Sequence, residues 1–475
     1  MKRYIAVLCA AAVMWGCALQ LPPQQMPVVV PDEYIFTQKG DTTLVVGVEW
    51  WEIFGDTTLN RLILTALENN RNVRVALSKV AQAQLSLRSV RAESLPSFDI
   101  SVNGEGSYQL STLTGKKAIG QQYSVLPEVS WEISLFGRLK NATAAAEAEI
   151  FASEWAYRGA MLSLAAQVAE TYFEWLQYAR CLEISERSFS LREQAQHKID
   201  TMYYYGFSSR VDLEQARSLT ATAAANIPSY RRAMVQTNLV LNTLIGEEPR
   251  LLMPPAAGRA CGNEEQYDGL LYCGDLTAAE LPAYIPAGLP SELLARRPDV
   301  REAEQTVDAA AARARVARAE RFPSISLTGS GGVLAYTVKG LTAHNPFYWA
   351  AASSITQPIF AFGRLKAAEE SAKEDYRQAL LSYEQTMLEA LSDVESALVA
   401  IETYRNESRR YITLIDANSQ TQQMTEALYA DGLANYLNVI DAERNLYSSQ
   451  LEYITILTSQ LSAYVSLYKA LGGGW

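Results

Sequence analysis

The chain has 475 residues, of which 49% are hydrophobic and 20% charged, so it has material for two or three packed domains and its composition argues against disorder. Its formal net charge of -11 argues against a nucleic-acid partner, because phosphate binding requires an excess of lysine and arginine. The two histidines, His197 and His344, leave little material for a histidine-based metal site or catalytic triad. We therefore expect neither an enzyme nor a bound cofactor or metal.

Residues 1–16 have the pattern of a cleavable export signal, in which two basic residues precede an uncharged segment. Cys17 follows directly after a small residue, an arrangement that resembles a bacterial lipoprotein signal and predicts that Cys17 carries lipid. Cleavage near Ala18 without lipidation remains the alternative. The proline-rich residues 17–50 are predicted to form an extended, lipid-anchored leader.

One amphipathic helix is predicted from Asp56 to Glu93, with Asp56 or Thr57 as its N-cap and Pro96 beyond its end. After Pro96 the pattern changes to the two-residue alternation of strands. Two alternating runs precede Gly137 and two more precede Gly363, so each half of the chain supplies one β-hairpin.

Each run is long enough to cross a bilayer, because a strand of about 13 residues measures roughly 43 Å. A soluble sandwich would show the same alternation, but aromatic residues at both ends of the runs favour a membrane barrel. One group is Tyr108, Tyr123, Tyr336, Tyr348 and Trp349, and the other is Phe98, Trp131, Phe136, Phe360 and Phe362.

A very long helix is predicted after each hairpin, over residues 138–205 and 364–431, because neither segment contains proline. Each would measure about 100 Å at the rise of an α-helix. In the second segment apolar residues recur every seven positions, which predicts a coiled-coil seam of Leu380, Met387, Val394 and Ile401. Gly206 and Gly432 are predicted to end these helices, and a returning helix follows each glycine.

The two halves are copies of one unit. The motif Phe-Gly-Arg-Leu-Lys at residues 136–140 recurs at residues 362–366, which is 226 residues later. We interpret it as a hinge between strand and helix, formed by Gly137 and Arg138 in one copy and Gly363 and Arg364 in the other. Repeat 1 is predicted to cover residues 51–246 and repeat 2 residues 291–472.

Residues 247–290 are predicted to connect the repeats, because they are rich in proline and acidic residues. Cys261 and Cys273 lie in this connector, and in an exported protein we expect them to form a local disulfide. A metal site at these two thiols is the alternative. Cys181 is expected to be an apolar helix residue.

Three motifs resemble the outer membrane factor family of TolC-like efflux ducts, in its OprM and NodT-type lipoprotein branch. They occupy residues 131–138, 285–304 and 436–444, where the second has the sequence IPAGLPSELLARRPDVREAE. The resemblance implies an α+β membrane protein that forms a homotrimer in the outer membrane. It implies a 12-stranded β-barrel, with four strands from each chain, continued into the periplasm by a long α-helical barrel.

The same resemblance implies the outer-membrane channel of a tripartite efflux system, which passively exports drugs, metals or similar small solutes. Its partners would be a periplasmic adaptor and an inner-membrane pump of the resistance-nodulation-division type. Independently, four strands per chain cannot close a barrel in lipid, so the sequence itself requires an oligomer. A structural periplasmic rod or an adaptor protein is the alternative, and the duplicated strands disfavour it.

Two groups of site residues follow from the resemblance. The turns after the long helices would dock the adaptor, through Gly206, Phe207 and Ser208 in one copy and Gly432, Leu433 and Ala434 in the other. A stripe of Leu437, Asp441 and Arg444 would close the periplasmic end of the channel, and its repeat-1 counterparts are Val211, Gln215 and Ser218. The alternative for this stripe is an exposed ion pair on a solvated helix face.

Overall fold

The computed structural model describes residues 49–110, 117–251, 294–338 and 347–473. The signal peptide, most of the leader with Cys17, and the connector with Cys261 and Cys273 lie outside the described residues. The described chain divides into two compact units. Unit 1 contains residues 78–154 and 302–385, and unit 2 contains the described parts of residues 28–77, 155–301 and 386–475.

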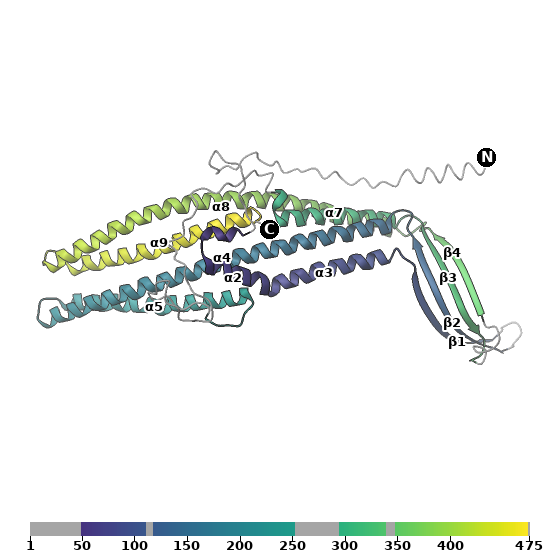
Figure 1. Cartoon of the computed structure of the whole chain (residues 1–475), viewed down its shortest axis with the longest axis horizontal. Coiled ribbons are helices and arrows are strands. Elements are labelled where there is room, and N and C mark those ends of the chain that lie inside the picture. The colour runs from purple at the N-terminus through teal and green to yellow at the C-terminus, as the bar shows by residue number, and fades with distance from the viewer. Residues whose placement is uncertain (1–48, 111–116, 252–293, 339–346, 474–475) are drawn as a thin grey trace. The chain divides into compact units, whose positions relative to one another are not determined.

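Unit 1 contains one antiparallel sheet in the order β1-β2-β3-β4 (Figure 1). Its strands are β1 (Ser97–Leu110), β2 (Lys117–Ile133), β3 (Ser324–Ala335) and β4 (Phe347–Thr356). The prediction of one hairpin per repeat is therefore confirmed, and the pairing of Ile133 with Ile325 joins the two hairpins. The outer strands β1 and β4 each pair with a single neighbour in this sheet.

The alternation of apolar residues on β1 leaves an uncovered apolar face. Phe98, Ile100 and Val102 are between 72% and 77% exposed. These residues lie on one side of the strand because successive side chains point to opposite faces. A single chain therefore does not bury this side of its sheet. None of the helices in the described ranges is long and apolar enough to cross a membrane.

The predicted first helix is wrong in one respect, because it is two helices, α2 (Thr57–Asn69) and α3 (Arg71–Ala92). Asp56 caps α2 as predicted, by accepting hydrogen bonds from the N–H groups of Thr58 and Leu59 at 2.8 and 3.2 Å. Asn70 adopts an extended backbone and accepts from the N–H groups of Asn72 and Val73. This cap satisfies the first turn of a new helix and so interrupts the apolar periodicity.

The long helices are α4 (Arg138–Tyr204) and α8 (Arg364–Ala430), each of 67 residues, which confirms their prediction to within a residue. The returning helices are α5 (Arg210–Ile245) and α9 (Tyr436–Ala470), and α7 (Pro298–Ala319) precedes β3. The predicted seam is buried at Met387, Val394 and Ile401, whereas Leu380 is half-buried.

The repeated motif has a left-handed glycine between strand and helix in both repeats. Gly137 and Gly363 have φ of 77° and 83°. In unit 1 the guanidinium of Arg138 donates two hydrogen bonds to the carboxylate of Glu132 on β2, at 3.0 and 3.2 Å. Arg364 is the first residue of α8 and is exposed.

In unit 2, the last turn of each returning helix accepts a hydrogen bond from a residue of the same repeat. This residue directly precedes the helix that leads to the β-hairpin, which is α3 in repeat 1 and α7 in repeat 2. Asn70 donates from Nδ2 to the carbonyl of Leu244 at 2.8 Å, and at the equivalent place in repeat 2 Arg297 donates to the carbonyl of Ala470 at 3.2 Å. Asn70 also caps α3, whereas in repeat 2 the N–H of Val300 is accepted by Asp299.

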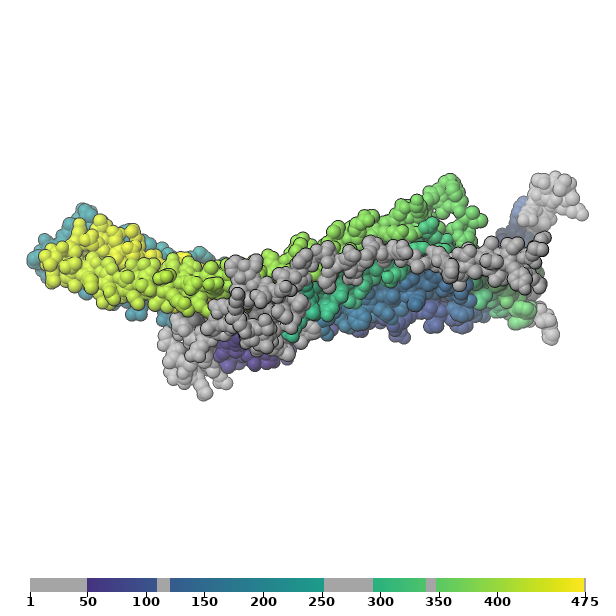
Figure 2. Space-filling model, turned by 90° about the horizontal axis from the view of Figure 1, so that it is seen from above, coloured from purple at the N-terminus to yellow at the C-terminus, as the bar shows by residue number. Residues whose placement is uncertain are grey.

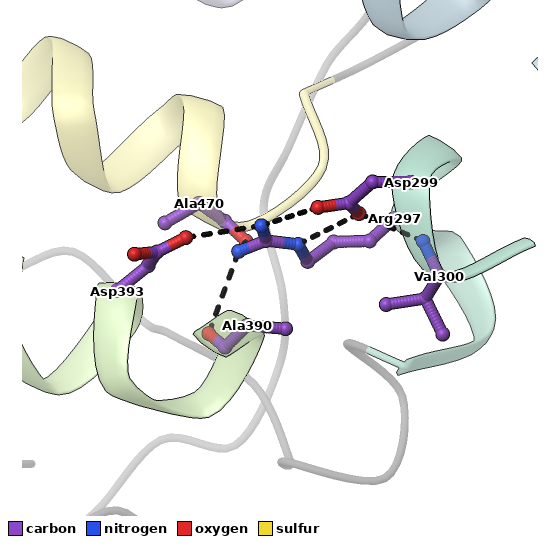
Figure 3. Close-up of polar contacts among 6 residues, drawn as sticks. All are labelled: Arg297, Asp299, Val300, Ala390, Asp393 and Ala470. Carbon is purple, nitrogen blue, oxygen red and sulfur yellow. Dashed lines mark hydrogen bonds and ion pairs between the residues drawn. The ribbon is translucent and has the colours of Figure 1, made fainter. Parts of the chain in front are cut away.

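Arg297 makes further contacts that Asn70 lacks the length and charge to make (Figure 3). Its guanidinium pairs with both carboxylate oxygens of Asp299, at 2.6 and 3.0 Å, and with Asp393 of α8 at 3.0 Å. It also donates to the carbonyl of Ala390 at 3.4 Å. The repeat-2 joint therefore connects α7, α8 and α9 through one buried cation.

Candidate functional site

Two helix hairpins of unit 2, α4–α5 and α8–α9, end in turns of the same geometry (Figure 1). Gly206 and Gly432 have φ of 77° and 74°, in the left-handed region that glycine adopts without steric cost. The next residue in each turn closes it, because the N–H of Phe207 donates to Met202 and that of Leu433 to Leu428, both at 2.8 Å. Both predicted turns are therefore confirmed as Schellman-type helix ends.

The two turns differ in the side chains that they expose. The α4–α5 turn presents aromatic rings at Tyr204, Tyr205 and Phe207, whereas the α8–α9 turn presents Leu433. Phe207 is 80% exposed and Leu433 76% exposed. The rings of Tyr204 and Tyr205 contact each other at 5.2 Å, but these side chains remain largely exposed, and exposed apolar groups of this size mark contact surfaces.

The cap that begins each returning helix also differs between the repeats. Ser209 and Asp212 form a capping box at the start of α5, and the hydroxyl of Ser208 donates to the Asp212 carboxylate at 3.3 Å. The amide oxygen of Asn435 accepts from the N–H of Leu437 at the start of α9. Ala434 lies between the glycine and this cap and is half-buried.

The charged stripe of repeat 2 lies on the surface of α9, which Figure 2 shows in yellow beside the teal α4–α5 hairpin. Arg444 and Asp441 form an ion pair at 3.0 Å, with side-chain exposures of 67% and 49%. Leu437 is 46% exposed one turn earlier. The three residues share one face of the helix, and in a single chain that face is open to solvent.

A small apolar cluster beneath the stripe packs the two hairpins together. Ile199 of α4 and Leu213 of α5 meet Tyr436 and Val439 of α9, and all four are buried. The ring of Tyr429 on α8 lies 5.2 Å from that of Tyr436. The start of α9 is therefore anchored on the repeat-1 hairpin.

A buried polar cluster one to two turns farther along α9 was not predicted from the sequence. Arg192 of α4 is 4% exposed, and its Nε lies 3.6 Å from Oε2 of Glu443. Its guanidinium stacks on the ring of Tyr447 at 5.1 Å and donates to the carbonyl of Leu219 on α5 at 3.4 Å. Arg192 thus contacts both α5 and α9.

The hydroxyl of Tyr447 completes this cluster by hydrogen bonding to Ser185 at 2.8 Å and to the amide of Asn226 at 3.2 Å. The spacing of Arg192 is a sequence signal, because it lies seven residues after Ser185 and seven before Ile199. The structure buries all three residues. A charge at a seam position of a long helix is the pattern that points to it.

The charges of this cluster are poorly compensated. Burial lowers the pKa of Arg192 and raises the pKa of Glu443, although the two groups attract each other. The thiol of Cys181, elsewhere in unit 2, is also buried, and its pKa is raised to about 12, so it behaves as an apolar residue. Within the described ranges no three histidine, cysteine or acidic side chains gather as metal ligands would.

Comparison with known proteins identifies the architecture. The family model for outer membrane efflux protein matches residues 62–247 and 289–473, which are the two repeats. The chain is 33% identical to the toluene efflux pump outer membrane protein TtgC of Pseudomonas putida, covering 100% of this chain and 96% of that protein. It is 31% identical to the cation efflux system protein CusC of Escherichia coli O157:H7, covering 98% of each.

Among solved structures, the open state of the MtrE outer membrane channel of Neisseria gonorrhoeae superposes with a TM-score of 0.80 at 29% identity. That comparison covers 96% of this chain and 98% of MtrE. These findings confirm the predicted family, the channel fold and the outer-membrane location with its periplasmic extension. The chain belongs to the outer membrane efflux protein family and is an outer-membrane efflux channel.

Proposed function

We propose that three copies of this chain close into one duct, with a 12-stranded barrel in the outer membrane and a helical barrel in the periplasm. The observation that carries this proposal is the open sheet, in which β1 and β4 are both edges and one face is apolar and uncovered. An edge in lipid leaves backbone N–H and C=O groups unpaired, so the sheet needs β4 of one copy against β1 of the next.

The channel works without catalysis, as a passive conduit for solutes that an inner-membrane pump delivers. A periplasmic adaptor docks at the two hairpin turns, where Gly206, Phe207 and Ser208 and their repeat-2 counterparts Gly432, Leu433 and Ala434 meet it. The exposed aromatic rings of the first turn support this assignment. The pump is of the resistance-nodulation-division type.

The resting channel is closed by Leu437, Asp441 and Arg444 of three copies of α9 that surround its axis. Adaptor binding opens it by preferring the separated arrangement of the hairpins. An acidic ring at this position favours cations in the resting pore. The exported solutes are small drugs, organic solvents or metal cations, in keeping with the relatives named for toluene and for cations.

The trimer and the channel are tested together on protein extracted from outer membranes in mild detergent. The mass of the protein part, measured by light scattering, is expected to equal three chains, and the purified material is expected to conduct ions in planar bilayers. A monomer, or a trimer without conductance, would contradict the proposal. A strain that lacks the gene should regain solute export when the gene is restored.

A further inference from the structure

The buried contact between Arg192 and Glu443 is an unusual way to attach the helix that carries the gate. Glu443 lies between Asp441 and Arg444 in the sequence, but its side chain is only 14% exposed and points toward α4. The Nε to Oε2 distance of 3.6 Å is too long for a hydrogen bond, and Oε2 has no hydrogen-bond partner among the described residues. The carboxylate is therefore buried without full compensation.

Comparison of the two repeats shows which contacts of Arg192 are shared with its repeat-2 equivalent and which are made by Arg192 alone. Arg192 donates to the carbonyl of Leu219 within its own hairpin, and the repeat-2 equivalent, Asn418, donates to the equivalent carbonyl of Asn445 at 3.3 Å. Asn418 otherwise bonds Ser449 of its own hairpin at 3.2 Å. Arg192 instead crosses to the other hairpin, through Glu443 and Tyr447.

The position that corresponds to Glu443 in repeat 1 also differs. It is Arg217, which is 49% exposed and forms surface ion pairs with Asp200 and Glu214. The buried charge pair therefore occurs on one side of the α4–α5 hairpin, where α9 packs against it.

A buried ion pair with poor geometry holds its helices together less strongly than an apolar contact of similar size. Removing Arg192 alone is worse, because the Glu443 carboxylate then stays enclosed without a cation. Arg192 is less affected by neutralising Glu443, because it still donates to the carbonyl of Leu219 and stacks on Tyr447. Both charges would recover water if α9 moved away from α4. Compared with a single remaining charge, the pair therefore holds α9 on α4 more strongly. Compared with an apolar contact at the same place, the pair holds α9 less strongly.

We propose that Arg192 and Glu443 form a release element, a positioning contact that keeps α9 on the repeat-1 hairpin but weakens this packing enough for the gate to open. The proposal rests on the gate assigned to α9 above. Arg192 and Glu443 are positioning residues, since they act through the placement of Asp441 and Arg444 and do not line the closed stripe.

Protonation of Glu443 adds a second measurable effect, a pH dependence of channel opening, which a contact with a purely structural role would not produce. The charged and titratable groups that face it are Arg192 of α4, Glu426 of α8 and Tyr436 of its own helix, and Tyr447 faces Arg192. Burial raises its pKa in the packed state, with Glu426 adding to the effect and Arg192 opposing it. Opening would hydrate the carboxyl and return its pKa toward the ordinary value, so the packed state binds the proton more tightly. Acidification should therefore favour the closed channel, and rising pH the open one.

Three variants and one control test the proposal on the assembled trimer. Arg192→Met leaves the carboxylate of Glu443 buried without its cation, whereas Glu443→Gln keeps an acceptor for Arg192 but removes the negative charge. Arg192→Met with Glu443→Leu replaces the pair by apolar contact. Arg217→Gln alters the exposed repeat-1 equivalent and is the matched control.

Hydrogen exchange of the backbone amides in residues 436–450 measures the packing of α9 directly. We expect about tenfold faster exchange in Arg192→Met, slower exchange than the parent by roughly threefold in Glu443→Gln and in the double variant, and no change in the control. Exchange in the double variant that equals or exceeds the parent's would overturn the proposal, because the pair would then be an ordinary stabilising bridge.

Conductance of the same trimers in planar bilayers tests the link to gating. The open fraction should rise in Arg192→Met and fall in the double variant, and its increase with pH in the parent should disappear in Glu443→Gln. Altered exchange with unaltered conductance would sink the gating role. Absence of conductance in the parent itself would instead contradict the proposed function, and the order of exchange rates would still decide whether the pair weakens the packing.

Discussion

At the scale of single residues, the structure separates two kinds of charge on α9. Asp441 and Arg444 pair on the surface of the chain, where an ion pair is worth a few tenths of a kcal/mol. Glu443, between them in the sequence, is only 14% exposed beside the buried Arg192, where a charge loses much of its hydration and costs more. The exposed pair is therefore free to act between copies of the chain, and the buried pair acts within it.

The exposed pair yields a prediction for the gate. Asp441→Ala combined with Arg444→Ser should raise single-channel conductance and admit bulky antibiotics, because it removes the polar links that we assign to the closed stripe. The free energy of unfolding of the chain should change by less than about 0.5 kcal/mol, as for other exposed ion pairs. Gln215→Ala with Ser218→Ala, at the repeat-1 counterparts, serves as the control. Conductance equal to that of the parent would leave the stripe as a solvated helix face.

At the scale of helices, each returning helix ends on a joint whose strength differs between repeats. In repeat 1 the neutral amide of Asn70 makes the joint, and in repeat 2 the buried guanidinium of Arg297 adds contacts to Asp299 and Asp393. Hydrogen bonds to charged groups are worth roughly twice those between neutral groups. The α8–α9 hairpin, which carries the proposed gate, therefore has the more strongly held base.

This difference predicts local effects of two substitutions. Arg297→Met should lower the stability of the last turns of α9 by about 2 kcal/mol, and Asn70→Ala that of the last turns of α5 by about 1 kcal/mol. Hydrogen exchange in residues 460–471 and 236–245 measures the two effects separately. Each variant acts as the control for the other, and faster exchange at the wrong helix end would show that the joints do not act locally.

The two hairpin turns give a second prediction at this scale. Gly206→Trp and Gly432→Trp should abolish solute export but leave the trimer in the membrane, because a Cβ at either glycine meets nothing within 4 Å of its own chain. The positive φ costs roughly 1–2 kcal/mol for any other residue.

Gly206→Ala and Gly432→Ala impose the same backbone strain without the bulk, so they are the matched controls and should retain export. Export is measured as resistance in a strain that depends on this channel. Full export from both tryptophan variants would argue against adaptor docking at the turns.

At the scale of the whole molecule, the sheet and the helices require different surroundings. The apolar side of β1 faces outward in a single chain, whereas the long helices bury their seams and leave charged faces exposed. Such a division suits a protein that is partly in lipid and partly in water. If the barrel holds the chain in the membrane, lipid on Cys17 is a second anchor and is not needed for insertion.

We therefore predict that Cys17→Ser abolishes labelling by a palmitate analogue while trimers still assemble in the outer membrane. A closed barrel inserts its own apolar band, so loss of the lipid should not release the protein. Membrane fractionation and native electrophoresis check the trimer, and Cys181→Ser serves as a control that keeps the label. Equal labelling of Cys17→Ser and the parent would contradict acylation at this residue.

The sequence by itself determined those features that a short stretch of chain encodes. The hinge at Gly137, the turn at Gly206 and the N-cap at Asp56 depend on neighbouring residues, and the periodicity that buries Met387 repeats every seven positions. Duplication reinforced the hinge and turn signals by presenting each of them twice. The family follows from motifs of the same local kind, which the matches over residues 62–247 and 289–473 confirm.

The tertiary structure alone decided the polar contacts between helices. Asn70 interrupts the first helix, and its amide bonds a carbonyl 174 residues away. Arg192 reaches Glu443 only because two hairpins from different repeats pack side by side. Nothing near these residues in the sequence names their partners, since the gain from pairing a buried charge depends on which distant helix excludes water from it.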